Sequence, residues 1–300
     1  MNYVITGSTG HISKPITQQL IAAGNKVTVV TSKAGNAAEI QALGATAAVG
    51  SVTDRDFLTR IFASADAVYL MIPPKFDVQD WFTYQKQVAD NYLAAVKANN
   101  IKHVVILSSV GAHMRKGCGP VDGAAYLEYE ARNLTGTHTL ALRPTYFYYN
   151  LFGQVNTIKQ AGIVASTQPA DFKMGLTHTS DIADVAAARL LKLDFTGNSV
   201  QYIASDDTHT WAEITKALGA AIGKPELPYV QISDEQLQGA LTGAGLPPTV
   251  VEGYVTMNHA LTKGDMLADY WANRPKTFGK VKLNDFVKEF AGAYGAAANG

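Results

Sequence analysis

Short apolar runs alternate with helical stretches through the first half of this 300-residue chain. The predicted strands cover 2–6, 26–31, 46–50, 67–72, 103–108 and 138–143. Helices are expected between them, over 14–23, 36–43, 54–64, 79–99 and 124–134. This order is typical of a parallel sheet, whose strands are apolar because helices cover both faces. Right-handed crossovers then predict an α/β fold with a doubly wound parallel sheet.

The second half has a weaker pattern. Helices are expected over 151–160, 181–192, 210–222, 233–243, 247–261 and 283–293. A strand near 199–204 suggests that the chain returns to the main sheet. We therefore expect a sheet domain over 1–150 and a smaller, mixed lobe over 151–300.

Composition limits the classes of function. The 25 Lys and Arg residues balance 25 Asp and Glu residues, and the isoelectric point is near 7.1, which argues against a dedicated nucleic-acid binder. The single cysteine, Cys118, excludes an internal disulfide, and the seven histidines show no metal-ligand spacing, so no metal site is predicted. The first strand follows no basic leader, and no apolar stretch reaches the roughly 18 residues of a membrane span. A cytoplasmic protein without a membrane partner is expected.

The strongest local motif is Gly7-Ser8-Thr9-Gly10-His11-Ile12-Ser13, which follows the first strand and opens a helix. A dinucleotide diphosphate needs free N–H groups at the positive end of a helix and no Cβ in the way. Gly7 allows the sharp turn, and Gly10 allows close approach of the backbone. Ser13 takes the third small position, and its hydroxyl could cap the helix. A glycine turn without a ligand is the alternative, but the strand and helix around it favour cofactor binding.

The end of the second strand bears on which dinucleotide binds. A site for NAD usually has an acidic residue here for the ribose 2′-hydroxyl, yet none occurs before Glu39. The hydroxyls of Thr31 and Ser32 and the cation of Lys33 suit an additional phosphate, so NADP(H) is favoured over NAD(H). An ordinary exposed lysine is the alternative.

Four segments in the first 205 residues together resemble the NmrA-like family of atypical short-chain dehydrogenase/reductases. They are Gly7-Ser8-Thr9-Gly10, Ser108-Ser109-Val110-Gly111-Ala112, Leu142-Arg143-Pro144-x-x-Phe147-x-x-Asn150 and Thr179-Ser180-Asp181-Ile182-Ala183-Asp184-Val185-Ala186. The resemblance implies a Rossmann domain with a smaller carboxyl-terminal lobe and a substrate cleft between them. Family members include NADPH-dependent quinone reductases and nucleotide-sensing regulators.

The resemblance also implies positions for the ligands. The nicotinamide would lie near Ile72 and Pro73 and near Ser108 and Ser109. General topology indicates the same edge, because ligands of open α/β sheets bind beyond the carboxyl ends of the strands. The alternative for the two serines is that their hydroxyls only close the strand. Substrate contacts are expected from Tyr146, Phe147 and Asn150, although such aromatic residues often form core between lobes.

The Tyr-x-x-x-Lys pair of ordinary short-chain dehydrogenases is missing from the whole chain. In that pair, the lysine lowers the pKa of a tyrosine one helical turn away. Here Glu130 follows Tyr126 at the same spacing, and a carboxylate would raise the pKa of the phenol. Tyrosinate-assisted alcohol oxidation is therefore not expected.

Two classes of function remain. The first is an NAD(P)H-dependent reductase of a quinone-like acceptor, which stabilises the added charge itself and can take its proton from Tyr126, His113 or water. The second is a non-catalytic NADP(H)-binding redox sensor that acts through a protein partner. The missing pair fits both, and the aromatic residues favour the reductase. Cys118 follows Arg115 and Lys116, whose charges would favour a thiolate, but an inert loop cysteine is the preferred interpretation.

Overall fold

Seven parallel strands form the central sheet of the computed structural model, which describes residues 1–296. Their order across the sheet is β10-β6-β5-β4-β1-β2-β3. The bounds are β1 Asn2–Ile5, β2 Lys26–Thr31, β3 Thr46–Val49, β4 Ala67–Leu70, β5 His103–Leu107, β6 His138–Pro144 and β10 Asn198–Ile203. The chain reverses its direction of travel across the sheet between β1 and β4, which is the place where such folds bind ligands. The predicted α/β class with a doubly wound parallel sheet and a smaller mixed lobe is confirmed.

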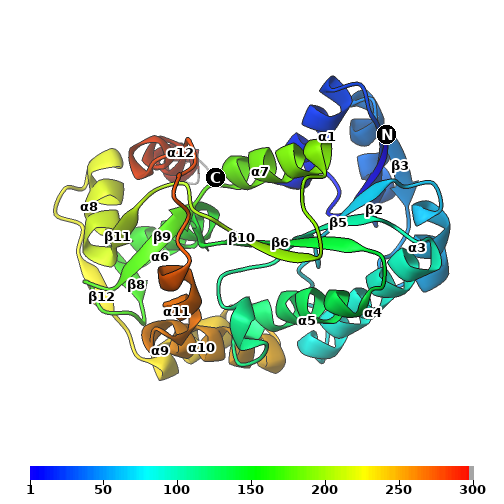
Figure 1. The fold of residues 1–300 in the computed structure, drawn as a ribbon. Coiled ribbons are helices and arrows are strands. Elements are labelled where there is room, and N and C mark those ends of the chain that lie inside the picture. The colour runs from blue at the N-terminus through cyan, green and yellow to red at the C-terminus, as the bar shows by residue number, and fades with distance from the viewer. Residues whose placement is uncertain (297–300) are drawn as a thin grey trace.

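Helices cover both faces of this sheet (Figure 1). The helices α1 Ser13–Ala22, α2 Ala37–Ala42 and α7 Thr179–Lys192 contribute to the core on one face. The helices α3 Arg55–Phe62, α4 Trp81–Ala98 and α5 Asp122–Glu130 contribute to the core on the other. Alternate strand residues supply the two cores: Ile5 and Tyr69 belong to the first, Val4 and Leu70 to the second. This double burial explains why the strands are continuous apolar runs.

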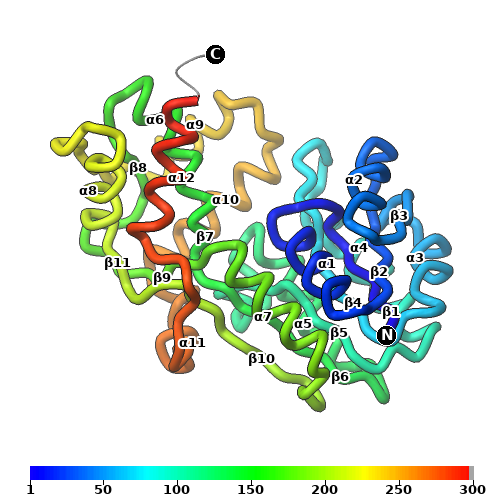
Figure 2. Tube along the Cα trace, turned by 90° about the horizontal axis from the view of Figure 1, so that it is seen from above, coloured from blue at the N-terminus to red at the C-terminus, as the bar shows by residue number. Residues whose placement is uncertain are grey.

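The remaining elements build the mixed lobe, which lies beside the sheet in Figure 2. Its helices are α6 Gln154–Ala161, α8 Trp211–Ala221, α9 Asp234–Gly243, α10 Pro248–Thr262, α11 Asp265–Ala272 and α12 Leu283–Ala296. Its strands are β7 Tyr146–Phe147, β8 Val164–Ser166, β9 Lys173–Thr177, β11 Thr208–Thr210 and β12 Tyr229–Gln231. They form one sheet in the order β11-β9-β7 and one β12-β8 pair. The sequence did not predict α11 or these short strands.

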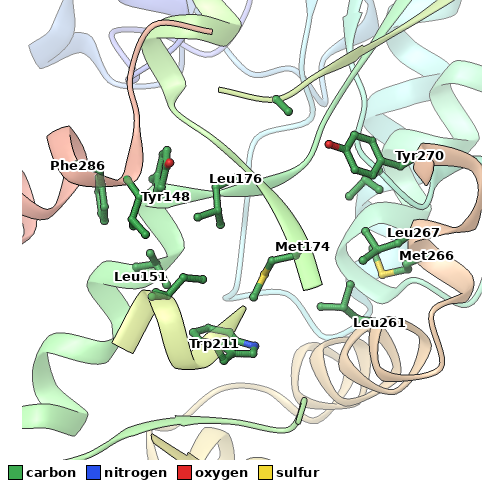
Figure 3. Packing of buried hydrophobic residues seen from close by; sticks show 14 of the residues in the cluster. Tyr148, Leu151, Met174, Leu176, Trp211, Leu261, Met266, Leu267, Tyr270 and Phe286 are labelled. Carbon is green, nitrogen blue, oxygen red and sulfur yellow. The ribbon is translucent and has the colours of Figure 1, made fainter. Parts of the chain in front are cut away.

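Aromatic and aliphatic side chains fill the lobe (Figure 3). Tyr148 stacks on Phe286 with ring centroids 4.8 Å apart, and Trp211 stacks on Tyr229 at 5.7 Å. This core includes residues directly after β6, so the lobe is packed against the end of the sheet.

After α7, the chain returns to the main sheet as β10, which pairs with β6 in parallel from Asn198 to Ile203. The lobe is therefore built from segments on both sides of β10 in the sequence. The boundary at residue 150 stays a prediction. Among the described residues, no helix combines the length and apolar character needed to cross a membrane.

Candidate functional site

The glycine turn connects β1 to α1 in a conformation that side chains would obstruct. Gly7 has a φ of 95°, and a Cβ added there would lie 2.4 Å from Ser13 Oγ and 3.0 Å from Met71 Cγ. Ser8 also has a positive φ, 55°. The Ser13 hydroxyl donates to the carbonyl oxygen of Thr6 at 2.8 Å and is buried. The expected capping role of Ser13 is therefore wrong, because this side chain instead ties the helix to β1.

The residues present at this turn fit a dinucleotide diphosphate. Within residues 1–296, the backbone N–H groups of His11 and Ile12 donate to no protein acceptor. The first turn of α1 carries no acidic residue. Unpaired N–H groups at the positive end of a helix are the usual ligands of a phosphate group.

A cavity of about 1140 Å³ opens at this turn. It exceeds the roughly 300–1,000 Å³ of a typical small-molecule pocket, so it has room for an extended ligand. It is lined by residues from the carboxyl ends of β1, β2 and β4, from the loop after β4, and from the segment after β6. They include Gly7, Ser8, Gly10, His11, Ile12, Ser13, Val30, Thr31, Ser32, Lys33, Gly50, Ser51, Tyr69, Met71, Pro73, Pro74, Phe76, Tyr84, Leu107, Phe147, Tyr149 and Thr179.

At the β2 end of the cavity, hydroxyl groups and an amide surround the backbone. Ser8 Oγ donates to Thr31 Oγ1 at 2.9 Å, and Asn36 Nδ2 donates to Ser8 Oγ at 2.9 Å. Lys33 lines the same end. Glu39, the first acidic residue after β2, pairs with Lys14 at 2.7 Å and does not line the cavity. Hydrogen bonds from Lys14 and from the Thr9 side chain lower the pKa of Glu39.

The rim above β4 is aromatic and contains an unsatisfied polar atom. Tyr69, a fully buried residue of β4, contributes to the cavity lining, and its hydroxyl has no hydrogen-bond partner within residues 1–296. Burial raises the pKa of Tyr69, so this phenol remains a neutral donor. An orphaned donor in a cavity wall is a group that a bound ligand can satisfy. Nearby, Tyr84 donates to the carbonyl oxygen of Pro73 at 3.3 Å, which holds the loop after β4.

The aromatic residues after β6 divide between the cavity and the lobe. Phe147 and Tyr149 line the cavity. Tyr146 packs against Trp211 with centroids 6.0 Å apart, and Tyr148 is fully buried in the lobe core. Tyr149 meets a residue of the glycine turn: its hydroxyl lies 3.1 Å from Nε2 of His11, and the two rings are 4.5 Å apart.

The structure separates several other expected residues from this cavity. Thr9, Ile72, Ser109 and Asn150 are absent from its lining, and the two catalytic candidates lie elsewhere. The Tyr126 hydroxyl donates to Asp90 Oδ1 at 2.8 Å, on the outer side of α5.

The Ser108 side chain also forms its hydrogen bond outside this cavity. Its Oγ donates to Glu128 Oε2 at 2.7 Å, and both residues are buried. Glu128 in turn forms an ion pair with Arg143 at 2.6 Å. Ser108 therefore holds a buried ion pair together on the face opposite α1.

The surroundings of Cys118 disfavour a thiolate and agree with the preferred interpretation of an inert cysteine. Cys118 is buried, and its Sγ lies 3.3 Å from the sulfur of Met114. Burial, with a smaller effect from Asp122, raises the pKa of Cys118 to about 12. The neighbouring cations do not produce a thiolate, because desolvation is the larger effect.

Comparison with known proteins assigns the family. The model of the NmrA-like family matches residues 2–265. This chain belongs to the NmrA-like family. An NAD(P)H azoreductase of Xenophilus azovorans is 26% identical over 298 residues, covering 98% of this chain and 99% of that protein. An uncharacterized oxidoreductase of Bacillus subtilis, YesF, is 26% identical over 263 residues, covering 87% of this chain and 85% of that protein.

Solved structures show that the fold of this NmrA-like protein is shared. An NADPH-dependent quinone oxidoreductase of Escherichia coli, complexed with NADPH, superposes with a TM-score of 0.79 at 20% identity, covering 96% of this chain and 99% of that one. A triphenylmethane reductase of Citrobacter sp. superposes with a TM-score of 0.77 at 18% identity, covering 97% of this chain and all of that one. At these identities, the similarity concerns the fold.

Proposed function

We propose that this NmrA-like protein is an NAD(P)H-dependent oxidoreductase that reduces a quinone-like or similarly electron-poor small molecule. The observation that carries the proposal is that one cavity joins the phosphate-binding turn to an aromatic wall. The names of its relatives, an azoreductase and a quinone oxidoreductase, support a reductase of flat, conjugated acceptors. The cavity holds no Tyr-x-x-x-Lys pair, which suits an acceptor that stabilises the added electrons itself.

The turn around Gly7 and Gly10 would hold the diphosphate through the free N–H groups of His11 and Ile12. The additional phosphate of NADP(H) would lie beside Lys33 and Ser32, since no carboxylate lines that end of the cavity. We therefore propose a preference for NADP(H) over NAD(H).

The reaction requires a hydride and a proton. When bound, NAD(P)H supplies the hydride, and conversion of a quinone to its hydroquinone consumes this hydride and one proton. Tyr126 and His113 lie outside the cavity, so the proton must come from other groups or from water. We assign it to His11 and Tyr149, a hydrogen-bonded pair on the cavity wall. The imidazole of His11 can return a proton to the tyrosine after each turnover.

The aromatic wall would position the acceptor. Phe147 and Phe76 present apolar faces to the cavity, and Phe76 is 41% exposed. Offset stacking on such faces favours a planar, conjugated molecule.

The experiment is anaerobic NADPH oxidation followed at 340 nm with a panel of small quinones and azo compounds. The proposal expects acceptor-dependent oxidation that saturates with at least one class. Binding of NADPH without oxidation by any acceptor would instead support a redox sensor that acts through a protein partner.

A further inference from the structure

The cavity at the glycine turn is called the nucleotide cavity below. A second cavity, of about 660 Å³, lies on the α5 face of the sheet and shares no lining residue with it. Its walls come from the segment after β5, from α5, from the edge strand β10 and from α11, which converge in Figure 1. Positively charged side chains predominate in it. Its charged lining residues are Arg115, Arg132, Arg143, Arg274, Glu128 and Asp269.

The floor of this cavity is an ion-pair network in which Arg143 lies between the carboxylates of Glu128 and Asp269. Arg143 donates to both carboxylate oxygens of Glu128, at 2.6 and 3.1 Å. It also donates to Asp269 Oδ2 at 2.9 Å and to the Tyr202 hydroxyl at 3.0 Å. Tyr202 donates in turn to Asp269. The Arg143 guanidinium therefore has little capacity left for a ligand.

The rim, in contrast, contains guanidinium groups with free donors. Arg115 forms no ion pair within residues 1–296; its guanidinium lies 3.9 Å above the Tyr129 ring. Arg132 lies 3.5 Å from Glu128 Oε1, an oxygen that already accepts from Arg143. Both arginine side chains are exposed at the cavity mouth. The fourth arginine, Arg274, forms an ion pair with Asp207.

An unbalanced positive charge and an unpaired polar atom in this cavity both favour the binding of an anion. Arg115, Arg132 and Arg143 face only two carboxylates, those of Glu128 and Asp269, so one positive charge has no protein partner in the cavity. In addition, Nδ1 of His113 is buried and has no hydrogen-bond partner in the described part of the chain, residues 1–296. A buried polar atom without a partner is costly, and a ligand or water can relieve it.

The backbone at Arg115 supports the same interpretation. Arg115 has a φ of 66°, in the left-handed region that non-glycine residues seldom adopt. Such strained backbone is concentrated at functional sites. The Arg115 guanidinium lies over the Tyr129 ring, and both residues line the cavity.

We propose that this second cavity binds a small oxyanion, the carboxylate or phosphate group of a metabolite, between Arg115 and Arg132. The planar guanidinium of arginine pairs with both kinds of group through two parallel hydrogen bonds. His113 lies in the same wall and contributes its unpartnered nitrogen. The site is independent of the proposed reductase activity, since none of its residues lines the nucleotide cavity.

The test is isothermal titration of the full-length protein with inorganic phosphate and, separately, with malonate. Chloride holds the ionic strength constant, and each titration is repeated with NADP⁺ present to fill the nucleotide site. The proposal expects saturable binding of at least one anion with NADP⁺ present. The variants R115A and R132A should each weaken it by roughly tenfold, the value of one charge-assisted hydrogen bond.

The matched control is R60A, which removes an exposed arginine on α3 outside both cavities. This variant should bind the anions as the native protein does, and circular dichroism should show that all three variants are folded. The proposal is overturned if neither anion binds, if NADP⁺ abolishes the binding, or if R115A and R132A bind like R60A. Stronger binding of phosphate or of malonate identifies the preferred head group.

Discussion

Nε2 of His11 lies 3.1 Å from the Tyr149 hydroxyl oxygen, although 138 residues separate the two. The contact joins the glycine turn before α1 to the segment after β7, and both residues line the nucleotide cavity. It places an imidazole next to a phenol on the wall where an acceptor would bind.

Removal of this pair should slow acceptor reduction. We expect His11→Asn and Tyr149→Phe each to lower kcat by about 10- to 100-fold, because general acid–base catalysis contributes about 100-fold or more to the rate and water can replace part of it. The affinity for NADPH should change little. Tyr294→Phe, which removes a phenol on α12 outside the cavity, is the control. Unchanged kcat in both cavity variants would show that water supplies the proton.

Lys33 should discriminate between the two cofactors. Lys33→Ala is expected to weaken NADPH binding by about tenfold or more and NADH binding by less than about twofold, because only NADPH has a phosphate beside this cation. Lys26→Ala, at the opposite end of β2, is the matched control. Calorimetric titration measures the affinity of each variant and of the native protein for NADPH and for NADH. If Lys33→Ala loses the same affinity for both cofactors, the phosphate contact is excluded.

Most of the fold could be predicted from the sequence because its signals are local. The six strands from β1 to β6 are largely apolar runs, whose burial follows from neighbouring helices. The helix α11 and the five short strands of the lobe were missed, since eight residues or fewer carry too little periodicity to identify an element.

The candidate site was predictable only where one short segment forms it. Most residues of the glycine turn and of the end of β2 line the cavity, although Thr9 does not, and their contacts with a cofactor stay a prediction. Ser108 was assigned from its place at the end of β5, but its partner Glu128 lies 20 residues later and cannot be identified from spacing. Tyr84 and Tyr149 reach the cavity from α4 and from the lobe, so only the tertiary arrangement shows their position.

The buried ion pair between Glu128 and Arg143 should be important for stability. Glu128→Gln leaves the Arg143 charge partly uncompensated in a buried place, and loss of one partner of such a pair costs about 3–5 kcal/mol. Urea denaturation should therefore show a large decrease in the free energy of unfolding. Glu130→Gln, two residues away and only partly buried, should change it by less than about 0.5 kcal/mol. A Glu128→Gln variant as stable as Glu130→Gln would contradict the network described here.

Cys118 should make stability depend on pH in the alkaline range. Its folded-state pKa is about 12, whereas an unfolded thiol has a pKa of about 8.5. Above the unfolded pKa, the unfolded state releases a proton that the folded state retains, so the free energy of unfolding falls as the pH rises. The slope approaches about 1.4 kcal/mol per pH unit for one group.

Comparison with Cys118→Ala isolates this effect from the tyrosines whose pKa values are also raised. The difference in the free energy of unfolding between the native protein and Cys118→Ala should be constant below about pH 8 and should shrink from about pH 9 to 10.5. A difference that stays constant up to pH 10.5 would show that the folded protein also ionises this thiol.

Calorimetric titration with NADPH tests the central claim most directly, that the turn between β1 and α1 holds a dinucleotide diphosphate. The predicted result is binding at one site per chain with a Kd in the micromolar range, typical of a reductase cofactor. Gly10→Asp should abolish this binding, because its carboxylate would occupy and repel the diphosphate at the amino end of α1. Absence of binding by the folded native protein, or equal binding by Gly10→Asp, would contradict the account.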